Sequence, residues 1–204
     1  MSDVVRWARA LQAIAQSGLT YCESPYDRER YRSIMEIAAE IAAGATGEEP
    51  TVVLASFVEE SGYRTPKVDV RGVVLDGNRL LLVREFGRQE WCLPGGWADV
   101  GETPSEAVAK EVREEAGVTV RALRVLGVFD RDYRGRARWP AHVYKLYVLC
   151  ERAGGDPTPD GMETEAAAFF ALDQLPELSE KTPPEQLARA LATARDASLP
   201  AALD

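Results

Sequence analysis

The first part of the chain carries apolar residues at helical spacing. One stripe, which predicts a helix ended by Gly18, is formed by Val4, Trp7, Ala8, Leu11, Ile14 and Ala15. A second helix is expected to begin at Ser24-Pro25, because Ser suits an N-cap and Pro suits the first helical position. The stripe of this second helix comprises Tyr31, Ile34, Ala38 and Ile41. The small and polar residues 44–50 then predict a linker.

Two helices of this length bury little apolar surface by themselves. We therefore expect residues 1–47 to be a two-helix extension that packs on the next domain or on a second copy of the chain. Residues 48–204 are expected to form the main domain. A helix-turn-helix that binds DNA is a weaker interpretation, because the connection is long and no basic face points outward.

Beyond Pro50, short runs of β-branched and aromatic residues predict strands. The candidate strands are residues 52–58, 68–75, 80–84, 123–129, 142–150 and 169–171. Asp76-Gly77-Asn78 predicts the turn of a hairpin between the second and third of these. Helices are expected from Thr103 to Gly117 and over residues 186–196. Because strands and helices interleave, we predict an α/β fold with a mixed sheet and helices on both of its faces.

The helix after Thr103 has clear end signals. Thr103 suits the N-cap, Pro104 suits the first position, and Glu106 completes a capping box. Gly117 is placed to end the helix. Its predicted core face consists of Ala107, Val108, Val112 and Ala116.

The charge balance is acidic, with 33 Asp and Glu against 24 Lys and Arg, a net charge of −9. No basic surface is expected for long nucleic acid, and an anionic small substrate would need metal ions to approach. No apolar run approaches the length of a membrane span, and the polar start lacks the pattern of a signal peptide. Cys22, Cys92 and Cys150 have no metal-binding spacing and predict reduced thiols in a cytoplasmic protein.

Three glutamates give this helix its chemistry. Glu111, Glu114 and Glu115 lie three and four residues apart, so they share one sector of the helix and repel one another. A divalent cation would remove that repulsion, and carboxylate oxygens are preferred ligands of Mg²⁺ and Mn²⁺. The alternative is a solvated acidic face. The Gly95-Gly96 pair just before the helix favours a site, because a surface helix does not need it.

The segment from Gly96 to Val118 resembles the Nudix box. That pattern is Gly, five residues, Glu, seven residues, then Arg-Glu-apolar-X-Glu-Glu-X-Gly-apolar. The matching residues are Gly96, Glu102, Glu111, Val112, Glu114, Glu115, Gly117 and Val118. Lys110 departs from the pattern, because the family has an Arg there that helps to orient the glutamates. Lys keeps the charge but cannot make a planar two-pronged ion pair.

The resemblance implies a Nudix α/β/α sandwich with the box helix beside a mixed sheet, preceded by the small N-terminal helical hairpin. Residues 93–100, 142–151 and 169–179 also look like a bacterial subfamily with an N-terminal extension. That subfamily includes CDP-choline pyrophosphatases, and many relatives are labelled ADP-ribose pyrophosphatases. A homodimer, to which the N-terminal helices contribute, is expected.

For the site, the resemblance implies hydrolysis of a diphosphate linkage with Mg²⁺ or Mn²⁺. Glu114 and Glu115 would be the main metal ligands, with a contribution from the Gly95 carbonyl. Glu111 would either bind metal or act as the general base. A further carboxylate is expected before the last strand, where Glu163 is favoured over Glu165.

Four residues are candidates for contacts with the substrate. Arg84 could reach a phosphate, and the aromatic rings of Trp91 and Tyr133 could stack on a base. His142, the only histidine, could contact the substrate at the rim of the site. Each also has a structural interpretation: a solvated Arg, a core anchor for Trp91, and an internally hydrogen-bonded His.

Three functions remain open. The first is a Nudix hydrolase acting on a nucleoside diphosphate linked to a group X, such as CDP-choline or ADP-ribose. The second keeps the chemistry but acts on nucleoside triphosphates or trims RNA ends. The third is a noncatalytic metabolite sensor, which the intact set of glutamates disfavours. The partner expected in the first case is a small nucleotide, with no long nucleic acid and no membrane.

Overall fold

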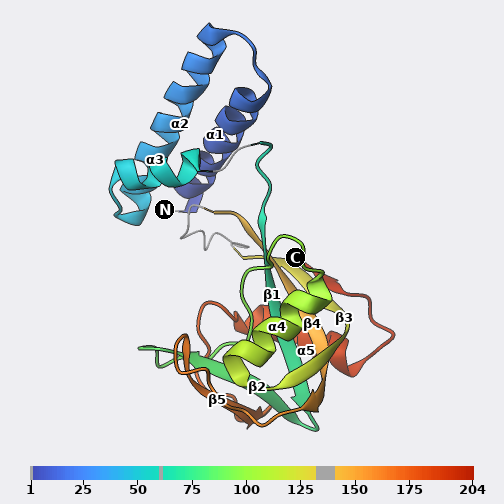
Figure 1. Ribbon diagram of the computed structural model, residues 1–204. Helices are drawn as coiled ribbons and strands as arrows, with labels where there is room; N and C mark the ends of the chain where they lie inside the picture. Colours follow the sequence, from blue (N-terminus) through green and yellow to red (C-terminus); the bar gives the residue numbers. More distant parts are fainter. Residues whose placement is uncertain (1, 60–61, 132–140) are drawn as a thin grey trace. The chain divides into compact units, whose positions relative to one another are not determined.

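The computed structural model describes residues 2–59, 62–131 and 141–204 (Figure 1). It divides into two compact units. The helical unit runs to Lys67 and includes the segment Asp130–Val143, and the sheet unit consists of Val68–Phe129 and Tyr144–Asp204. None of the described helices is both long enough and apolar enough to cross a membrane.

The helical unit contains three helices: α1 (Ser2–Tyr21), α2 (Pro25–Thr46) and α3 (Pro50–Val58). The start of α2 is as predicted, because the Ser24 hydroxyl caps the helix by accepting from the Asp27 N–H and Pro25 is the first residue. Gly47, with φ of 82°, ends α2 in the left-handed conformation.

Several predictions for this unit are wrong. Residues 44–46 belong to α2 and Pro50 begins α3, so the linker is shorter than predicted. Residues 52–58 lie in helix α3 rather than in a strand, because Val53 and Phe57, four residues apart, are both buried in the core of the helical unit. Packing at helical spacing outweighs the strand preference of the valines. Gly18 does not end α1. It lies against the Tyr31 ring, where a Cβ would be only 2.4 Å away, so the glycine permits close helix packing.

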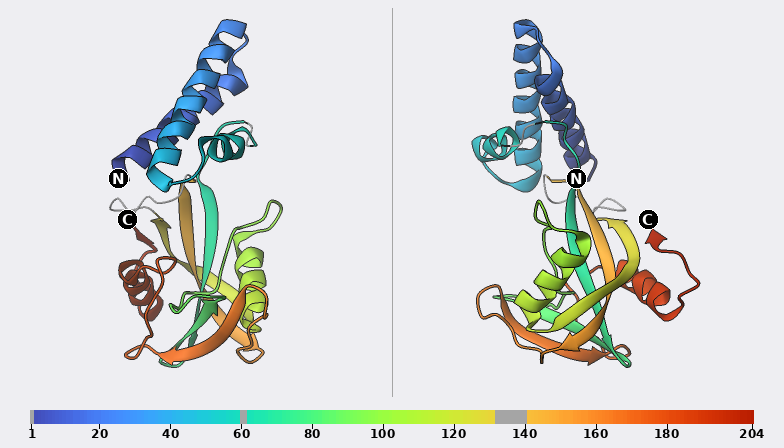
Figure 2. Two further views of the ribbon diagram at one scale, coloured as in Figure 1. Left: turned by 90° about the vertical axis from the view of Figure 1, so that its left-hand side faces the viewer. Right: turned by 45° about the vertical axis from the view of Figure 1, so that its right-hand side comes forward.

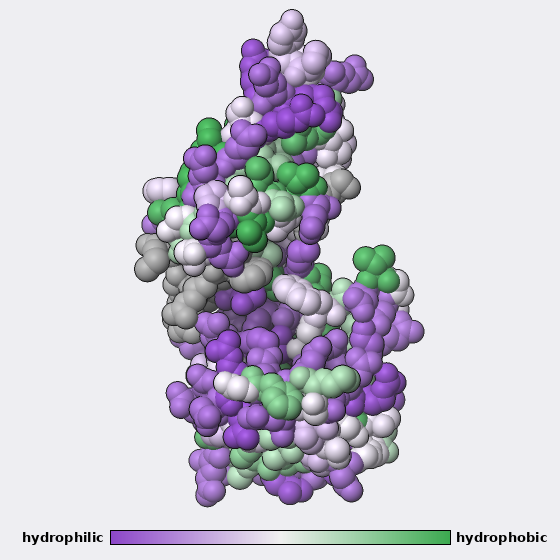
Figure 3. All heavy atoms as spheres, turned by 60° about the vertical axis from the view of Figure 1, so that its left-hand side comes forward, coloured by the Kyte–Doolittle hydropathy of each residue, from purple (hydrophilic) through white to green (hydrophobic). Residues whose placement is uncertain are grey.

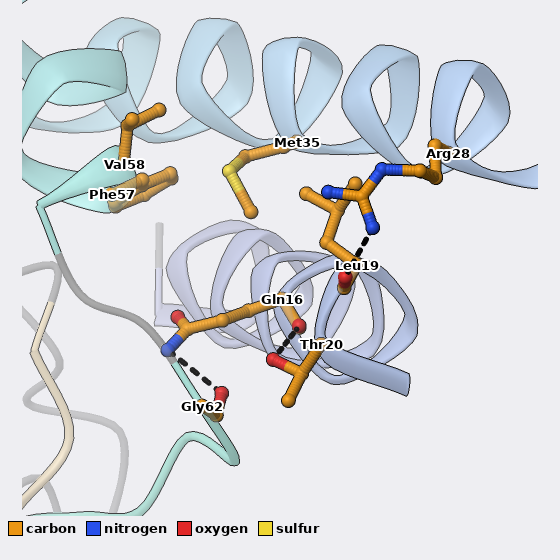
Figure 4. Close-up of a pocket in the computed structure, with 8 residues that line it drawn as sticks. All are labelled: Gln16, Leu19, Thr20, Arg28, Met35, Phe57, Val58 and Gly62. Atoms are coloured by element: carbon orange, nitrogen blue, oxygen red, sulfur yellow. Dashed lines mark hydrogen bonds between the residues drawn. The ribbon is translucent and has the colours of Figure 1, made fainter. Parts of the chain in front are cut away.

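A cavity of about 450 Å³ opens among these helices (Figure 4). Leu19, Met35 and Phe57 give it apolar walls. Gln16 borders it and donates from its side-chain amide to the Gly62 carbonyl at 3.1 Å. This hydrogen bond ties α1 to the chain that follows α3.

The sheet unit is built on a mixed sheet of six strands in the order β5-β2-β1-β4-β3-β6. The strands are β1 (Lys67–Asp76), β2 (Arg79–Glu85), β3 (Thr119–Asp130), β4 (Val143–Gly154), β5 (Thr164–Ala171) and β6 (Ala202–Leu203). β1 and β2 form the predicted hairpin, β2 pairs antiparallel with β5, and β3 pairs parallel with β6. The predicted α/β class and mixed sheet are confirmed.

Two helices, α4 (Pro104–Ala116) and α5 (Pro184–Arg195), cover opposite faces of this sheet (Figure 2). Along β2, Leu81 and Val83 face the core under α4, whereas Leu80 and Leu82 face the core under α5. Successive side chains of a strand point to opposite faces of the sheet, so β2 is buried on both faces. Helix α4, which carries the three glutamates, therefore packs directly on the sheet.

Candidate active site

Helix α4 has the ends that the sequence predicts. The Thr103 hydroxyl accepts from the Glu106 N–H at 3.3 Å, and the Glu106 carboxylate accepts from the Thr103 N–H at 2.9 Å, which completes the capping box. Gly117 ends the helix with φ of 68°. All four predicted core residues, Ala107, Val108, Val112 and Ala116, are fully buried. This packing fixes the rotation of α4 and hence the direction of its glutamates.

The Gly-rich loop is held against strand β1. The Gly72 N–H donates to the Pro94 carbonyl at 2.9 Å, and the Val70 N–H donates to the Gly96 carbonyl at 2.8 Å. Gly95 lies between them with φ of 145°, and a Cβ there would be 2.0 Å from the Val70 carbonyl oxygen. Only glycine fits this close approach.

The loop and the helix meet at two glutamates. The Gly95 N–H donates to Glu115 Oε2 at 2.8 Å. At Gly96, a Cβ would lie 2.7 Å from Glu111 Oε2, so the Glu111 carboxylate lies directly over the glycine. The structure thus brings Gly95, Glu111 and Glu115 together, as the sequence led us to expect. Glu114 is exposed, and its nearest ion-pair partner is Arg113 at 3.5 Å.

The environment disfavours the ionised forms of two of these acids. Burial raises the pKa of Glu115 to about 7, although the hydrogen bond from Gly95 and the charge of Arg71 oppose the rise. Burial also raises the pKa of Glu111, opposed by Lys110 and reinforced by the negative charges of Glu114 and Glu163. A bound cation would relieve both effects, because it stabilises the ionised carboxylates.

Lys110, the departure from the box pattern, bridges two acids. Its Nζ lies 2.7 Å from Asp99 Oδ2 and 3.0 Å from Glu102 Oε1. These contacts raise the pKa of Lys110, chiefly through the hydrogen bonds to Asp99 and then to Glu102. The lysine therefore ties the loop before α4 to the helix without the two-pronged pair that an arginine would make.

Glu163 and Glu165 have different surroundings. The Glu163 backbone is fixed, because its N–H donates to Asp160 Oδ1 at 3.0 Å and its carbonyl accepts from the Phe86 N–H at 3.0 Å. Its charge is close enough to raise the pKa of Glu111. Glu165 instead forms an ion pair with Arg84 at 3.0 Å. The electrostatic contact with Glu111 favours Glu163 as the additional carboxylate.

Sequence reasoning missed a buried ion pair beneath the loop. Arg71 donates to both carboxylate oxygens of Asp69, at 2.6 and 2.7 Å, and to the Leu93 carbonyl at 3.2 Å. Both side chains are buried, and the charge of Arg71 acts on Glu111 and Glu115. The sequence does contain an indication of this pair, because Asp69 and Arg71 alternate with valines in a predicted core strand.

Another missed residue is Glu85, at the end of β2. Its charge adds to the rise in the pKa of Glu115. Lys181 forms an ion pair with it through Nζ and Oε1. The Nudix box does not extend to this strand, so the pattern alone gave no reason to single Glu85 out.

The four predicted substrate contacts are only partly brought together. The Arg84 guanidinium lies over the Trp91 ring, 5.5 Å from its centroid. Trp91 packs edge-on against Phe170, with the ring centroids 4.6 Å apart, which is the arrangement of a core anchor. His142 belongs to the helical unit, where its Nε2 lies 3.2 Å from Asp130 Oδ2. Tyr133 lies outside the described residues.

The acidity of Glu115 gives a pH-dependent prediction. Its pKa is higher in the folded protein than in the unfolded chain, so its contribution to stability is present at low pH and is lost as pH rises through about 7. If Glu115 holds a divalent cation, the cation would bind its ionised form, so we predict that the stabilisation by added divalent cation grows from about pH 5 to about pH 8. Thermal unfolding with and without metal across this range measures it. In Glu115→Gln the growth should be much smaller, and an equal metal effect at both ends of the range in the wild type would contradict the assignment.

Two family models match most of the chain. Residues 65–191 match the NUDIX domain family, and residues 2–57 match a family described as a UDP-X-like, N-terminal oligomerisation domain. A Bacillus subtilis (strain 168) protein named "Putative ADP-ribose pyrophosphatase YjhB" is 41% identical over 88% of this chain and 86% of its own length.

Two solved structures are similar along much or all of the chain. A UDP-X diphosphatase is 32% identical, with a TM-score of 0.63 over 100% of this chain and 98% of that one. An ADP-ribose pyrophosphatase from Streptococcus suis 89-1591 is 40% identical, with a TM-score of 0.61 over 69% of this chain and 100% of that one. Glu111 and Glu115 lie at the Gly-rich loop, and the NUDIX model matches residues 65–191, more than half of the chain. The chain therefore belongs to the NUDIX family and is a pyrophosphohydrolase.

Proposed function

We propose that this Nudix hydrolase cleaves the diphosphate linkage of a nucleoside diphosphate joined to a small group X, with Mg²⁺ or Mn²⁺ as cofactor. The observation that carries the proposal is the contact of Glu111 and Glu115 with the Gly95-Gly96 loop. The names of the similar proteins support ADP-ribose and UDP-linked compounds as substrates, and CDP-choline remains a candidate from the sequence.

The donor set suits a hard divalent cation. Glu111, Glu114 and Glu115 offer only oxygen atoms, as Mg²⁺ and Mn²⁺ prefer. Among the residues that the structure describes, no three His, Cys, Asp or Glu side chains are already gathered to hold a metal ion. We infer that Glu114, Glu115 and Glu163 would hold the cation, and that the Gly95 carbonyl would add a further oxygen.

A bound metal would neutralise the anionic diphosphate and acidify a water molecule. The side chains of the protein would position the metal and the substrate and would accept the proton of the attacking water. Glu115 is held by the Gly95 N–H and Glu111 lies over Gly96, so both are fixed to the loop that would receive the phosphates. Glu111, half-buried and with a raised pKa, would either bind the cation or take the proton of the attacking water. Arg84 and Trp91 would border the substrate.

The N-terminal unit is proposed to join two copies into a dimer. The support is the match of residues 2–57 to an N-terminal oligomerisation domain. The division of the chain into an extension and a Nudix domain remains a proposal, and α3 is better placed with the extension, because its buried residues pack in the same core as those of α1 and α2.

A substrate panel tests the proposed class. ADP-ribose, CDP-choline, UDP-linked compounds and nucleoside triphosphates would be compared at saturating Mg²⁺ and at saturating Mn²⁺. We expect kcat/KM for the best diphosphate-linked compound to exceed that for any triphosphate by at least about tenfold. A preference for triphosphates, or for capped RNA ends, would instead indicate a nucleoside triphosphate pyrophosphatase or an enzyme that trims RNA ends.

The roles of the two candidate carboxylates before β5 can be separated by a matched pair of variants. Glu163→Gln should lower kcat/KM about 10- to 100-fold and raise the metal concentration needed for half-maximal activity. Glu165→Gln removes the same charge two residues away, at the ion pair with Arg84, and should leave the metal requirement within about threefold of the wild type. A metal titration of both variants measures this. The reverse order of effects would assign the role to Glu165.

A further inference from the structure

Helix α1 has two apolar faces. One face is in the core of the helical unit, where Val5, Ala8 and Ala15 are at most 3% exposed. The other face points outward, and there Trp7 is 56% exposed, Ile14 57% and Tyr21 70%. The sequence placed Trp7 and Ile14 in one stripe with Ala8 and Ala15, whereas in the structure only the alanines of this set are buried. Figure 3 shows apolar residues, in green, on the surface of the helical unit.

The outward residues have regular spacing. Trp7, Ile14 and Tyr21 are seven residues apart, so they lie along one line on the helix with a slow drift. We call these three residues the α1 stripe. Three large apolar side chains at heptad spacing are typical of a helix that packs against another helix. The outer face of α2 carries only Tyr26 and Ile37 as large apolar residues, at 73% and 51% exposure.

The α1 stripe belongs to the segment that matches an N-terminal oligomerisation domain. We therefore expect a second copy of the chain to cover the stripe. We propose that the α1 stripe is the contact between the two copies, with the two α1 helices antiparallel and Ile14 at the two-fold axis. This proposal specifies the interface of the proposed dimer and is independent of the proposed reaction.

The antiparallel direction follows from spacing and charge. Because Trp7 and Tyr21 are equally far from Ile14, an antiparallel pair places Trp7 against the partner's Tyr21 on both sides of the axis. A parallel pair would instead place the exposed Arg6, next to Trp7, beside the same residue of the second copy and align the two helix dipoles. The antiparallel pair avoids both repulsions.

The solution mass of full-length variants tests whether the α1 stripe forms the dimer contact. Ile14→Arg should convert the wild-type dimer into monomer, because it places two charges against each other at the centre of the apolar contact. Ile37→Arg is the matched control, since it makes the same change at a similarly exposed position on α2 and should leave the dimer intact. Circular dichroism checks that both variants stay folded. A dimeric Ile14→Arg variant, or a monomeric Ile37→Arg variant, would overturn the proposal.

Disulfide crosslinking tests the direction. In a Cys22→Ser background, Ile14→Cys should crosslink to a covalent dimer. Trp7→Cys and Tyr21→Cys should each crosslink poorly alone and efficiently as an equimolar mixture after subunit exchange. Efficient self-crosslinking of Trp7→Cys would show a parallel pair and overturn the antiparallel assignment. Turnover of the same variants is read separately, so loss of the dimer and failure of the proposed reaction remain distinguishable.

Discussion

Replacing Glu114 and Glu115 together by glutamine is expected to lower kcat/KM by about 10³-fold or more on the best substrate. Glutamine keeps the shape of each side chain but removes the negative charge that holds the cation. Glu114 is exposed, and the amide oxygen of a glutamine at position 115 can still accept from the Gly95 N–H, so the fold should persist. Steady-state kinetics at several metal concentrations, with circular dichroism on the same samples, measures both expectations.

A matched control separates a loss of site charge from a general change in net charge. Glu36 and Glu40 are exposed on α2, four residues apart, so a Glu36→Gln, Glu40→Gln variant removes the same two charges from another helix. Its kcat/KM should stay within about twofold of the wild type. A folded Glu114→Gln, Glu115→Gln variant with full turnover would remove the basis for metal binding by the box helix.

The second large effect concerns the ion pair beneath the loop. Arg71→Met should lower the free energy of unfolding by about 3 to 5 kcal/mol, because Asp69 would be left buried and without its counter-charge. An Arg71→Met, Asp69→Leu double variant removes both charges and should recover at least about half of this loss. Urea denaturation of the wild type and the two variants measures these differences.

Activity and stability should separate in this pair of variants. Both lose the hydrogen bond from Arg71 to the Leu93 carbonyl, and both lose the positive charge that acts on Glu111 and Glu115. We therefore expect kcat/KM to fall about 10- to 100-fold in both, even where stability returns. A double variant with wild-type activity would show that Arg71 serves only the fold and does not position the site.

Features set by neighbouring residues were predictable from the sequence. The capping box of Thr103 and the end of α4 at Gly117 depend on residues within one helical turn, so their residue types were sufficient. The β1–β2 hairpin follows in the same way from its turn. The approach of Glu111 and Glu115 to the Gly95-Gly96 loop was expected only because the resemblance to the Nudix box assigns Gly95 and these glutamates to one metal site.

Features set by tertiary packing were harder to predict. The valines of α3 have strand preference, and the burial of both Val53 and Phe57 in the core of the helical unit favours a helix there. Trp7 and Ala8 are adjacent in one apparent stripe, yet packing buries one and exposes the other. The acceptor of Arg71 at Leu93 is 22 residues away, and no local pattern encodes it.

The substrate contacts were the least predictable part. The Nudix box covers the loop and helix that would hold the metal, whereas Arg84 and Trp91 lie on other segments and contact each other and the core. Their surroundings are consistent with a structural role as well as with a place beside a nucleotide. Measured products and rates, rather than the sequence pattern, therefore identify the group X.

The identity of the reaction products distinguishes hydrolysis of a diphosphate bridge from hydrolysis of nucleoside triphosphates. The wild-type protein would be incubated with Mg²⁺ and the best diphosphate-linked substrate of the panel, and the products identified by phosphorus NMR and chromatography. Cleavage of the diphosphate bridge predicts equal amounts of a nucleoside monophosphate and phosphorylated X, with no inorganic diphosphate. Release of inorganic diphosphate from nucleoside triphosphates alone, with every diphosphate-linked compound left intact, would show that the protein does not hydrolyse nucleoside diphosphates linked to X.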